Sequence, residues 1–165
     1  MSLTKAFRAG FVRRWHMNPD LCHTVDPDDG HQGRVARIVL MLHPNPSIRL
    51  FSALLTHDDG ESTVGDIKAP SKDANPVFAA TLERMESQTR LDIWGTDYVA
   101  HLTDTDRDWL KFADRLDAFM WAKHHAPHVM DSDDWPEARQ RLIDAAICFG
   151  VLGQVADILE SEVTA

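Results

Sequence analysis

Two adjacent residues with metal-binding side chains, His57 and Asp58, end an unusually apolar stretch and are followed by Glu61. The stretch from Ser47 to Asp58 predicts a helix, and its apolar residues are Ile48, Leu50, Phe51, Ala53, Leu54 and Leu55. With about 3.6 residues per turn, both polar side chains are directed inward on such a helix. A buried carboxylate needs a compensating cation, which is either a basic side chain or a metal ion. The pair therefore indicates a metal site, and an ion pair at the helix end is the alternative.

Two other predicted helices place polar residues beside an apolar face in the same way. Between Gly30 and His43, His31 lies one turn before Val35 on an apolar stripe. Between Thr103 and His125, Asp114 lies at the edge of a long apolar surface. Considered alone, a histidine such as His31 is more often a hydrogen-bonded core residue or a surface residue than a metal ligand. Imidazole nitrogens and carboxylate oxygens suit a divalent transition metal or magnesium. The candidate ligands for one ion are His31, His57, Asp58 and Asp114.

The order of these four residues resembles the signature of the HD-domain phosphohydrolases, which hold one divalent metal inside a helical bundle. Other segments are similar to the bacterial 5'-deoxynucleotidases, and equally to the short phage-encoded deoxyadenosine triphosphate triphosphohydrolases. These segments are Arg13-Arg14-Trp15, the block from His57 to Asp66, Pro70 with Lys72, and Lys111 to Asp114. The resemblance extends from Arg8 to Trp121, and the C-terminal helix matches only in character. It implies a compact all-α HD-domain bundle with a buried divalent metal, in which Asp58 is both a ligand and a catalytic residue.

The resemblance also implies roles for the charged residues around the metal. Glu61 would be the acid or base that handles the attacking water or the leaving oxygen, a task for a carboxylate close to the metal but not on it. Arg14 and Lys72 would bind phosphate oxygens, and Lys111 is a further candidate because it lies one turn before Asp114. Without the resemblance, these basic residues are ordinary surface charges.

Two residues would contact the nucleoside. Trp15 would pack against the nucleobase or the sugar, since an aromatic face stacks on any base. Asp66 would accept a hydrogen bond from the 3'-hydroxyl of a deoxyribose, and packing near C2' would exclude a ribose hydroxyl. The alternative for Trp15 is a core position.

The segment that leads to His31 departs from the family pattern. Residues 25–32 read VDPDDGHQ, which is longer and more acidic than the usual turn, with Gly30 where the family has glutamate. His23 is the nearest competing ligand, but no apolar helix follows it. The acidic segment can instead be solvated and have no role in the site.

Length and periodicity predict one domain over residues 1–165. A hydrophobic content of 44% supports one core, helical periods recur along the chain, and alternating strand patterns are absent. Asn75 to Gln88 is expected to form a polar-faced helix that acts as a lid. Asp133-Asp134 with Pro136 predicts the start of a C-terminal helix that Gly150 and Gly153 interrupt.

Charge and cysteine content narrow the class of partner. The net charge is -9, from 26 acidic and 17 basic residues, which argues against binding a nucleic-acid polymer. A small anionic substrate would then need a local positive site. Cys22 and Cys148 form no Cys-x-x-Cys motif, and neither a secretory nor a membrane-spanning segment is evident, so a cytoplasmic location is expected. P-loop, dinucleotide-binding and Gly-x-Ser-x-Gly motifs are also absent.

The hypothesis from the sequence is a metal-dependent phosphohydrolase that removes the 5'-phosphates of 2'-deoxynucleotides. The resemblance favours slightly a triphosphohydrolase that acts on dATP and related triphosphates and releases the deoxynucleoside. The alternatives are a 5'-deoxynucleotidase acting on monophosphates and a non-catalytic HD domain that binds a nucleotide to regulate a partner. The expected cofactor is one Co, Mn, Zn or Mg ion, with additional Mg for a triphosphate, and a homo-oligomer is expected.

Overall fold

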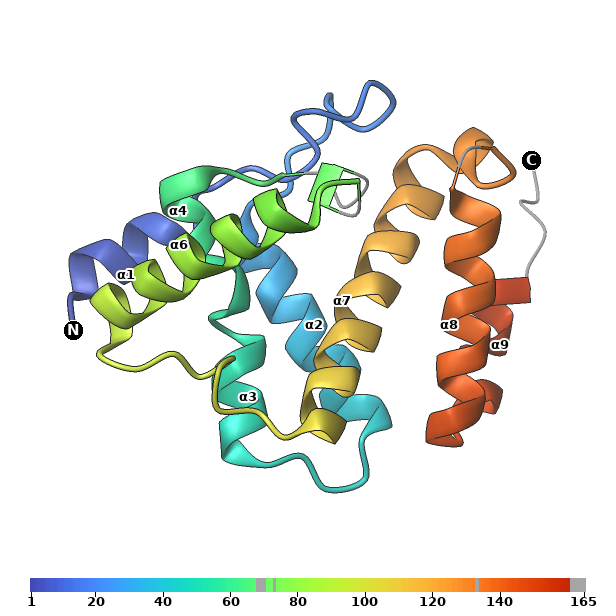
Figure 1. Ribbon diagram of the computed structural model, residues 1–165. Helices are drawn as coiled ribbons and strands as arrows, with labels where there is room; N and C mark the ends of the chain where they lie inside the picture. Colours follow the sequence, from blue (N-terminus) through green and yellow to red (C-terminus); the bar gives the residue numbers. More distant parts are fainter. Residues whose placement is uncertain (68–70, 73, 133, 161–165) are drawn as a thin grey trace.

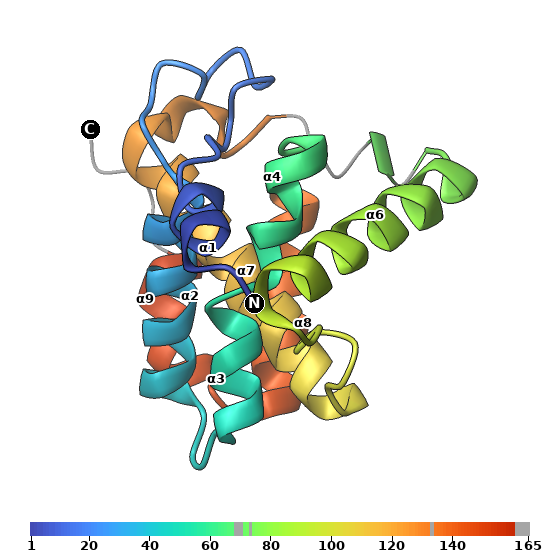
Figure 2. The ribbon, with the colours of Figure 1, turned by 90° about the vertical axis from the view of Figure 1, so that its left-hand side faces the viewer.

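Helices α2 (Asp28–Leu42) and α7 (Asp104–His125) pack against each other in the middle of the molecule (Figure 1). The computed structural model describes residues 1–67, 71–72, 74–132 and 134–160. The helix α3 (Ile48–Leu54) lies against both central helices, and α8 (Trp135–Phe149) and α9 (Leu152–Glu160) cover one side. The other side carries α1 (Leu3–Ala9), α4 (Glu61–Val64) and α6 (Pro76–Trp94), as Figure 2 also shows. Short 3-10 helices are η1 (His57–Gly60) and η2 (Pro127–Val129).

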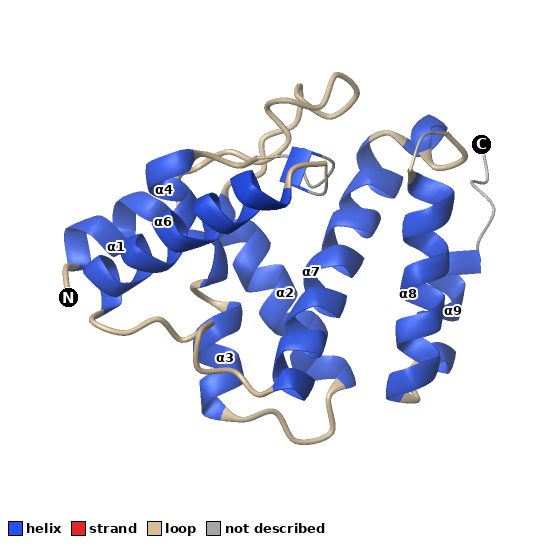
Figure 3. Cartoon of the chain, in the orientation of Figure 1, coloured by secondary structure: helices blue, strands red, loops and turns tan. Residues whose placement is uncertain are grey.

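The all-α class predicted from the sequence is confirmed. Within the described ranges no strand forms, and β-type pairing is restricted to one bridge between Arg13 and Pro27 (Figure 3). The centre is filled by fully buried apolar side chains of α2, α3 and α7, which are Val35, Val39, Leu50, Leu54, Leu116 and Phe119. No helix in the described part of the chain is both long and apolar enough to span a membrane.

The prediction that the apolar helix extends to Asp58 is wrong, because α3 ends at Leu54 and His57 begins the separate 3-10 turn η1. Two side chains bind the last carbonyls of α3 in place of further helical turns. Thr56 Oγ1 donates to the carbonyl of Ser52 at 2.7 Å, and His57 Nδ1 donates to the carbonyl of Leu54 at 3.0 Å. This change of direction carries His57 and Asp58 into the interior.

Helix α6 crosses η1 and α4 at very close range. A Cβ atom on Gly60 would lie 2.5 Å from Glu86 Cβ and 2.7 Å from Glu86 Cα, so only glycine permits this approach. The helix begins after Asn75, as predicted, but continues past Gln88 to Trp94, where Gly95 ends it with φ of 75°. Its length positions Arg90 against the backbone carbonyl of His57, to which Nη1 donates at 3.1 Å.

The C-terminal region forms two helices, as the glycines predicted. Gly150 adopts a left-handed conformation with φ of 70° and separates α8 from α9, whereas Gly153 lies inside α9. The ring of Phe149 stacks on Trp109 of α7 with centroids 4.0 Å apart, which fixes α8 to the centre of the bundle. Asp133, part of the predicted helix start, lies outside the described residues.

A buried ion pair holds the end of α6 to the segment that follows it. Asp97 accepts hydrogen bonds from Arg90 Nε at 2.9 Å and Nη2 at 3.1 Å, and its Oδ1 also accepts from the backbone N–H groups of Val99 and Ala100. We expect Asp97→Asn to lower the free energy of unfolding by about 3 kcal/mol, because Arg90 would lose its closest buried counter-charge and keep only the largely exposed Glu83 at 2.8 Å and Glu86 at 3.9 Å. Chemical denaturation monitored by circular dichroism measures this loss. Asp131→Asn is the matched control, since Asp131 pairs with Arg139 at the surface and should cost less than about 1 kcal/mol.

The Arg90–Asp97 pair also predicts how the stability difference between the wild type and Asp97→Asn depends on pH. Burial alone would raise the pKa of Asp97, but the hydrogen bonds from Arg90 hold that pKa below its ordinary value. Its contribution to stability is therefore present above the unfolded-state pKa of about 4 and is lost as the pH falls through the lower folded-state pKa. The stability gap between wild type and Asp97→Asn should narrow in acid. An equal gap at all pH values would contradict this assignment.

Candidate metal centre

Four predicted ligands from three elements meet at the junction of α2, η1 and α7. The Nε2 atom of His31 lies 3.4 Å from Asp58 Oδ2 and 3.1 Å from Asp114 Oδ1. The Nε2 atom of His57 lies 3.6 Å from the same Asp58 oxygen. Ligand atoms that share one ion at about 2.1 Å are separated by about 3 to 3.5 Å in tetrahedral or octahedral geometry. The spacing of the four side chains thus fits one divalent ion.

In each histidine, Nδ1 contacts a group outside the cluster, and Nε2 is the nitrogen that faces the other candidate ligands. His57 Nδ1 must carry a proton, since it contacts the carbonyl of Leu54, and His31 Nδ1 lies 2.7 Å from Asp117 Oδ2. Each contact directs an Nε2 lone pair into the site. Both Nε2 atoms are buried; that of His57 has no hydrogen-bond partner among the described residues, and that of His31 faces Asp114 Oδ1 at 3.1 Å. Two buried imidazole nitrogens directed at carboxylates suit a metal site.

A set of charged side chains supports His31 from behind. Arg34 Nε donates to Asp117 Oδ1 at 2.7 Å, and Arg34 Nη2 donates to Asp26 Oδ1 at 2.7 Å. Asp117 and Asp26 are both buried. Asp117 therefore holds the imidazole of His31 in one orientation while Arg34 fixes Asp117, an arrangement that orients metal-binding histidines generally.

The carboxylates of the cluster are held in the charged form that a metal needs. Burial opposes ionisation, but the hydrogen bond with His31 and the positive charge of Arg14 keep the pKa of Asp114 well below its usual range. His57 and Arg14 likewise lower the pKa of Asp58 against the effect of burial. Although burial lowers the pKa of His31, hydrogen bonds to Asp114 and Asp117 raise it to about 9. An arriving metal would displace this proton.

Arg14 lies inside the cluster rather than at its rim. Its Nη1 donates to Asp58 Oδ2 at 2.6 Å, and its Nη2 lies 3.7 Å from Asp114 Oδ1. The guanidinium thus supplies positive charge to two candidate ligands. The resemblance assigned Arg14 to phosphate oxygens; the structure places its guanidinium against the candidate ligands Asp58 and Asp114, and its contact with phosphate stays a prediction.

Trp15 and Asp66 are linked to each other beside the cluster. Asp66 Oδ2 accepts a hydrogen bond from the backbone N–H of Trp15 at 3.0 Å, and the Trp15 indole Nε1 donates to Asp26 Oδ2 at 3.0 Å. Trp15 has a left-handed φ of 65°, which is rare for an aromatic residue and which these two contacts stabilise. The half-buried ring packs against the core and lies 6.4 Å from the ring of Trp135. The structure therefore gives Trp15 a structural role, and its contact with a nucleobase stays a prediction.

Glu61 lies in the first turn of α4 and is buried beside the metal ligands. Burial and the negative charges of Asp58, Asp66 and Asp28 raise the pKa of Glu61 to about 10, despite the opposing effect of Arg14. This carboxyl group would therefore carry a proton in the absence of a further cation. A group that can hold and release a proton next to a metal centre is suited to acid or base catalysis.

The two predicted phosphate-binding lysines lie in different places. Lys72 forms an ion pair with Glu86 at 3.6 Å, and the charges that raise its pKa include Glu61 and Asp58, so it lies near the cluster. Lys111 is exposed and lines a hollow between α7 and α8, away from the ligands. The structure does not bring Lys111 to the site. Pro70, which contributes to the resemblance, lies outside the described residues.

The acidic segment before His31 is solvated only in part, since Asp29 is exposed. Asp26 and Asp28 are both 0% exposed, because the segment folds over the cluster as it enters α2. Sequence reasoning did not assign Asp28 or Asp117. Their spacing offers a signal, since Asp28 lies three residues before His31 and Asp117 three residues after Asp114, which places each on the same helix face as a ligand. The competing ligand His23 is exposed.

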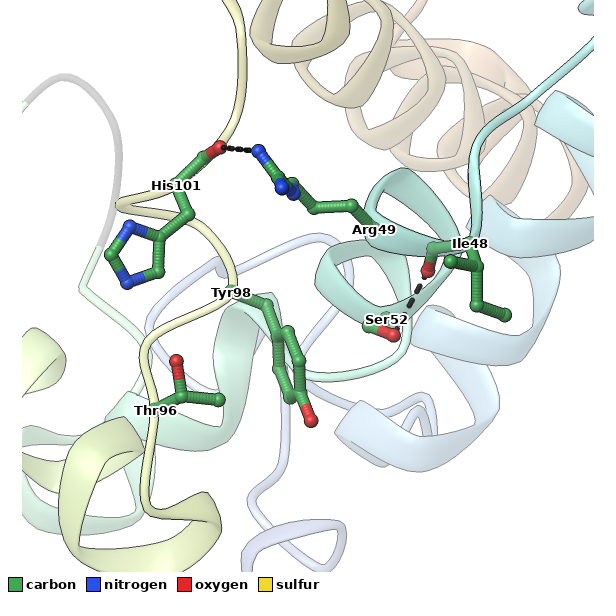
Figure 4. Close-up of a pocket in the computed structure, with 6 residues that line it drawn as sticks. All are labelled: Ile48, Arg49, Ser52, Thr96, Tyr98 and His101. Carbon is green, nitrogen blue, oxygen red and sulfur yellow. Dashed lines mark hydrogen bonds between the residues drawn. The ribbon is translucent and has the colours of Figure 1, made fainter.

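A larger hollow of about 550 Å³ lies elsewhere and contains no candidate ligand. It is lined by residues of α3 and of the segment after α6, which are Ile48, Arg49, Ser52, Thr96, Tyr98 and His101 (Figure 4). Arg49 Nη1 donates to the carbonyl of His101, and Ser52 Oγ to that of Ile48, so both polar groups stabilise the local backbone. None of the four candidate metal ligands therefore lines this hollow.

Comparison of the chain with models of protein families, with curated proteins and with solved structures finds no match. The assignment of a function depends on the geometry of the cluster and on the sequence resemblance.

The contact between Asp117 and His31 predicts a specific effect on metal binding. We expect Asp117→Asn to weaken binding of Co²⁺ by about 10- to 100-fold, because the imidazole would lose the charge that orients it. Isothermal titration of the metal-free protein measures the affinity. Asp144→Asn, on the exposed face of α8, is the matched control and should leave the affinity unchanged. Equal affinities in both variants would show that Asp117 does not position His31.

Proposed function

We propose that the chain is an HD-domain phosphohydrolase that uses a divalent metal to remove the 5'-phosphates of 2'-deoxynucleotides. One observation carries the proposal: the buried Nε2 atoms of His31 and His57 lie beside the carboxylates of Asp58 and Asp114. The order of these residues in the chain supports it, since it is the H, HD, D order of that family.

The metal would be held by His31, His57, Asp58 and Asp114, a mixed nitrogen and oxygen set suited to Co, Mn or Zn as well as Mg. When bound, it would polarise a phosphoryl oxygen and lower the pKa of a water molecule. Asp117 and Arg34 would keep the His31 ring in place throughout the reaction.

Glu61 would serve as the proton carrier. Its carboxyl group lies in the same buried region as Asp58 without being one of the four ligands, and its raised pKa allows it to donate a proton at neutral pH. Hydrolysis of the 5' ester needs one proton for the leaving 5' oxygen and removes one from water. A single carboxyl group that alternates between these two tasks balances the protons.

Arg14 and Lys72 would bind the phosphate. In this structure Arg14 neutralises Asp58 and Asp114, so a bound metal would take over that task and leave the guanidinium for phosphate oxygens. Lys72 would have to exchange its contact with Glu86 for the phosphate. Helix α6, which begins just after Lys72, would act as the lid. These two cations give an acidic protein the local positive charge that an anionic substrate requires.

Asp66 and Trp15 would select the sugar and the base. Asp66 Oδ2 accepts a hydrogen bond from the backbone N–H of Trp15. Because this bond holds the two residues side by side, they would form one nucleoside site. Contact with the 3'-hydroxyl and with the base is carried over from the family resemblance. A triphosphate is the favoured substrate on the same ground, and additional Mg would accompany it.

Product analysis distinguishes the candidate activities. The protein is supplied in turn with Co²⁺, Mn²⁺, Mg²⁺ and Zn²⁺ and incubated with deoxy- and ribonucleoside mono- and triphosphates. We expect release of deoxynucleoside with inorganic triphosphate from deoxynucleoside triphosphates, and little reaction with ribonucleotides. Deoxynucleoside and orthophosphate from monophosphates alone would assign a 5'-deoxynucleotidase. Nucleotide binding without turnover for any metal would replace the enzyme with a regulatory HD domain.

The role of Glu61 is tested by Glu61→Gln, which keeps the shape but cannot exchange a proton. We expect kcat to fall by about 10²- to 10⁴-fold, the usual contribution of a positioned acid or base, while the ion at His31, His57, Asp58 and Asp114 is retained. Glu137→Gln, at an exposed position on α8, is the control and should keep full activity. Unchanged turnover in Glu61→Gln would remove this residue from the mechanism.

A further inference from the structure

A hollow of about 280 Å³ lies between α7 and α8, and none of the four candidate metal ligands lines it. Three basic side chains line this α7–α8 hollow, which are Lys111, Arg115 and Arg141. Among the described residues around it, Asp108 is the single acidic one. The chain as a whole has 26 acidic and 17 basic residues. An excess of positive charge in one hollow of an acidic protein indicates a site for an anion.

Two of these cations have no ion-pair partner among the described residues. Lys111 and Arg115 lie four residues apart on α7, and both are exposed. Within the described ranges neither side chain forms an ion pair or a hydrogen bond, and neither is paired with Asp108. Like charges at this spacing on a helix repel one another. An anion that bridges the two side chains would relieve this repulsion.

The third cation reaches the hollow from α8. Arg141 Nη2 donates to Glu137 Oε2 at 2.9 Å, and the two side chains are 59% and 73% exposed. An ion pair so open to solvent contributes little to stability, so a ligand can replace Glu137 as the partner of Arg141. Guanidinium groups bind the oxygens of phosphate, sulfonate and carboxylate groups through paired N–H donors. The cations of the two helices can therefore share one anionic group.

The same hollow has an apolar and aromatic lining. Phe112 and Leu142 are buried there, and the half-buried Phe149 lies beside them. The ring of Phe149 is held in place by Trp109, with centroids 4.0 Å apart, and by Phe112 at 5.5 Å. A fixed aromatic surface favours a ligand with a planar ring. A volume of about 280 Å³ is at the low end of the range for ligand sites, so the ligand must be small.

We propose that the α7–α8 hollow binds a small organic anion that combines a planar apolar ring with a phosphate, sulfonate or carboxylate group. Lys111, Arg115 and Arg141 would bind the anionic group, and the ring would lie against Phe149. This site goes beyond the proposed function, because it uses none of the residues assigned to the metal or to the phosphohydrolase reaction.

The test is a titration of the metal-free, ¹⁵N-labelled protein with 1-naphthalenesulfonate, followed through the amide chemical shifts. We expect the largest shifts in α7 around Lys111 and Arg115 and in α8 near Phe149, with an affinity that falls as salt is added. Sulfate alone and 1-naphthol alone should each bind at least about 10-fold more weakly, because each keeps only part of the contacts. Titrations with 1-naphthyl phosphate and 1-naphthoate then identify the preferred anionic group.

Charge-removing variants make the outcome decisive. Lys111→Gln and Arg115→Gln should each weaken binding by about 3- to 10-fold, and both should fold because the positions are exposed. Arg37→Gln, at an exposed arginine of α2, is the matched control and should bind as the wild type does.

Three results would overturn the proposed site. They are no binding by the wild type, unchanged affinity in both Lys111→Gln and Arg115→Gln, and shifts at His31 and His57 in place of the hollow. Each would leave the proposed metal centre and its function standing, since the metal ligands are not varied and no turnover is measured.

Discussion

The structure depends on the burial of one imidazole between two helices. His31 is fully buried where α2 meets α7, and its two nitrogens face carboxylates of α7, Asp114 on one side and Asp117 on the other. Neither helix can slide or rotate without breaking one of these contacts. The apolar packing of α2 on α7 supplies most of the stabilisation, but packing tolerates small shifts, whereas a buried charged hydrogen bond does not. The contacts of His31 in the candidate metal centre therefore also set the relative position of the two central helices.

The junction of α2 and α7 at His31 also explains why acidic side chains are buried in this protein. An imidazole between two carboxylates needs those carboxylates to be ionised, and the positive charges of Arg14 near Asp114 and of Arg34 at Asp117 favour this form. Several acidic residues are thus internal: Asp26 and Asp117 contact arginines, whereas buried oxygens of Asp28 and Glu61 have no hydrogen-bond partner among the described residues. Such unpaired groups cost stability.

Close backbone contact between η1 and α6 places the remaining functional groups. The absence of a side chain at Gly60 lets α6 lie directly over the turn that carries His57 and Asp58, and Arg90 and Trp94 of α6 bind that turn through the His57 carbonyl and the Asp59 carboxylate. The position of α6 thereby determines where Lys72, which contacts Glu86 of that helix, lies relative to the cluster. A change in the tilt of α6 would therefore move Lys72 relative to the cluster.

The sequence by itself determined the helical class, the breaks between helices and the residues that meet at the centre, because apolar periodicity, glycines and isolated inward polar groups are local properties of the chain. It placed His31 and Asp114 on the correct helix faces for this reason. Only the tertiary structure decided that His57 leaves α3 through a 3-10 turn, that Lys111 faces away from the site, and that Asp28 is buried without a partner. Each of these depends on which elements pack around a residue, and the free energy of a charged group is set by those distant neighbours rather than by its position in the sequence.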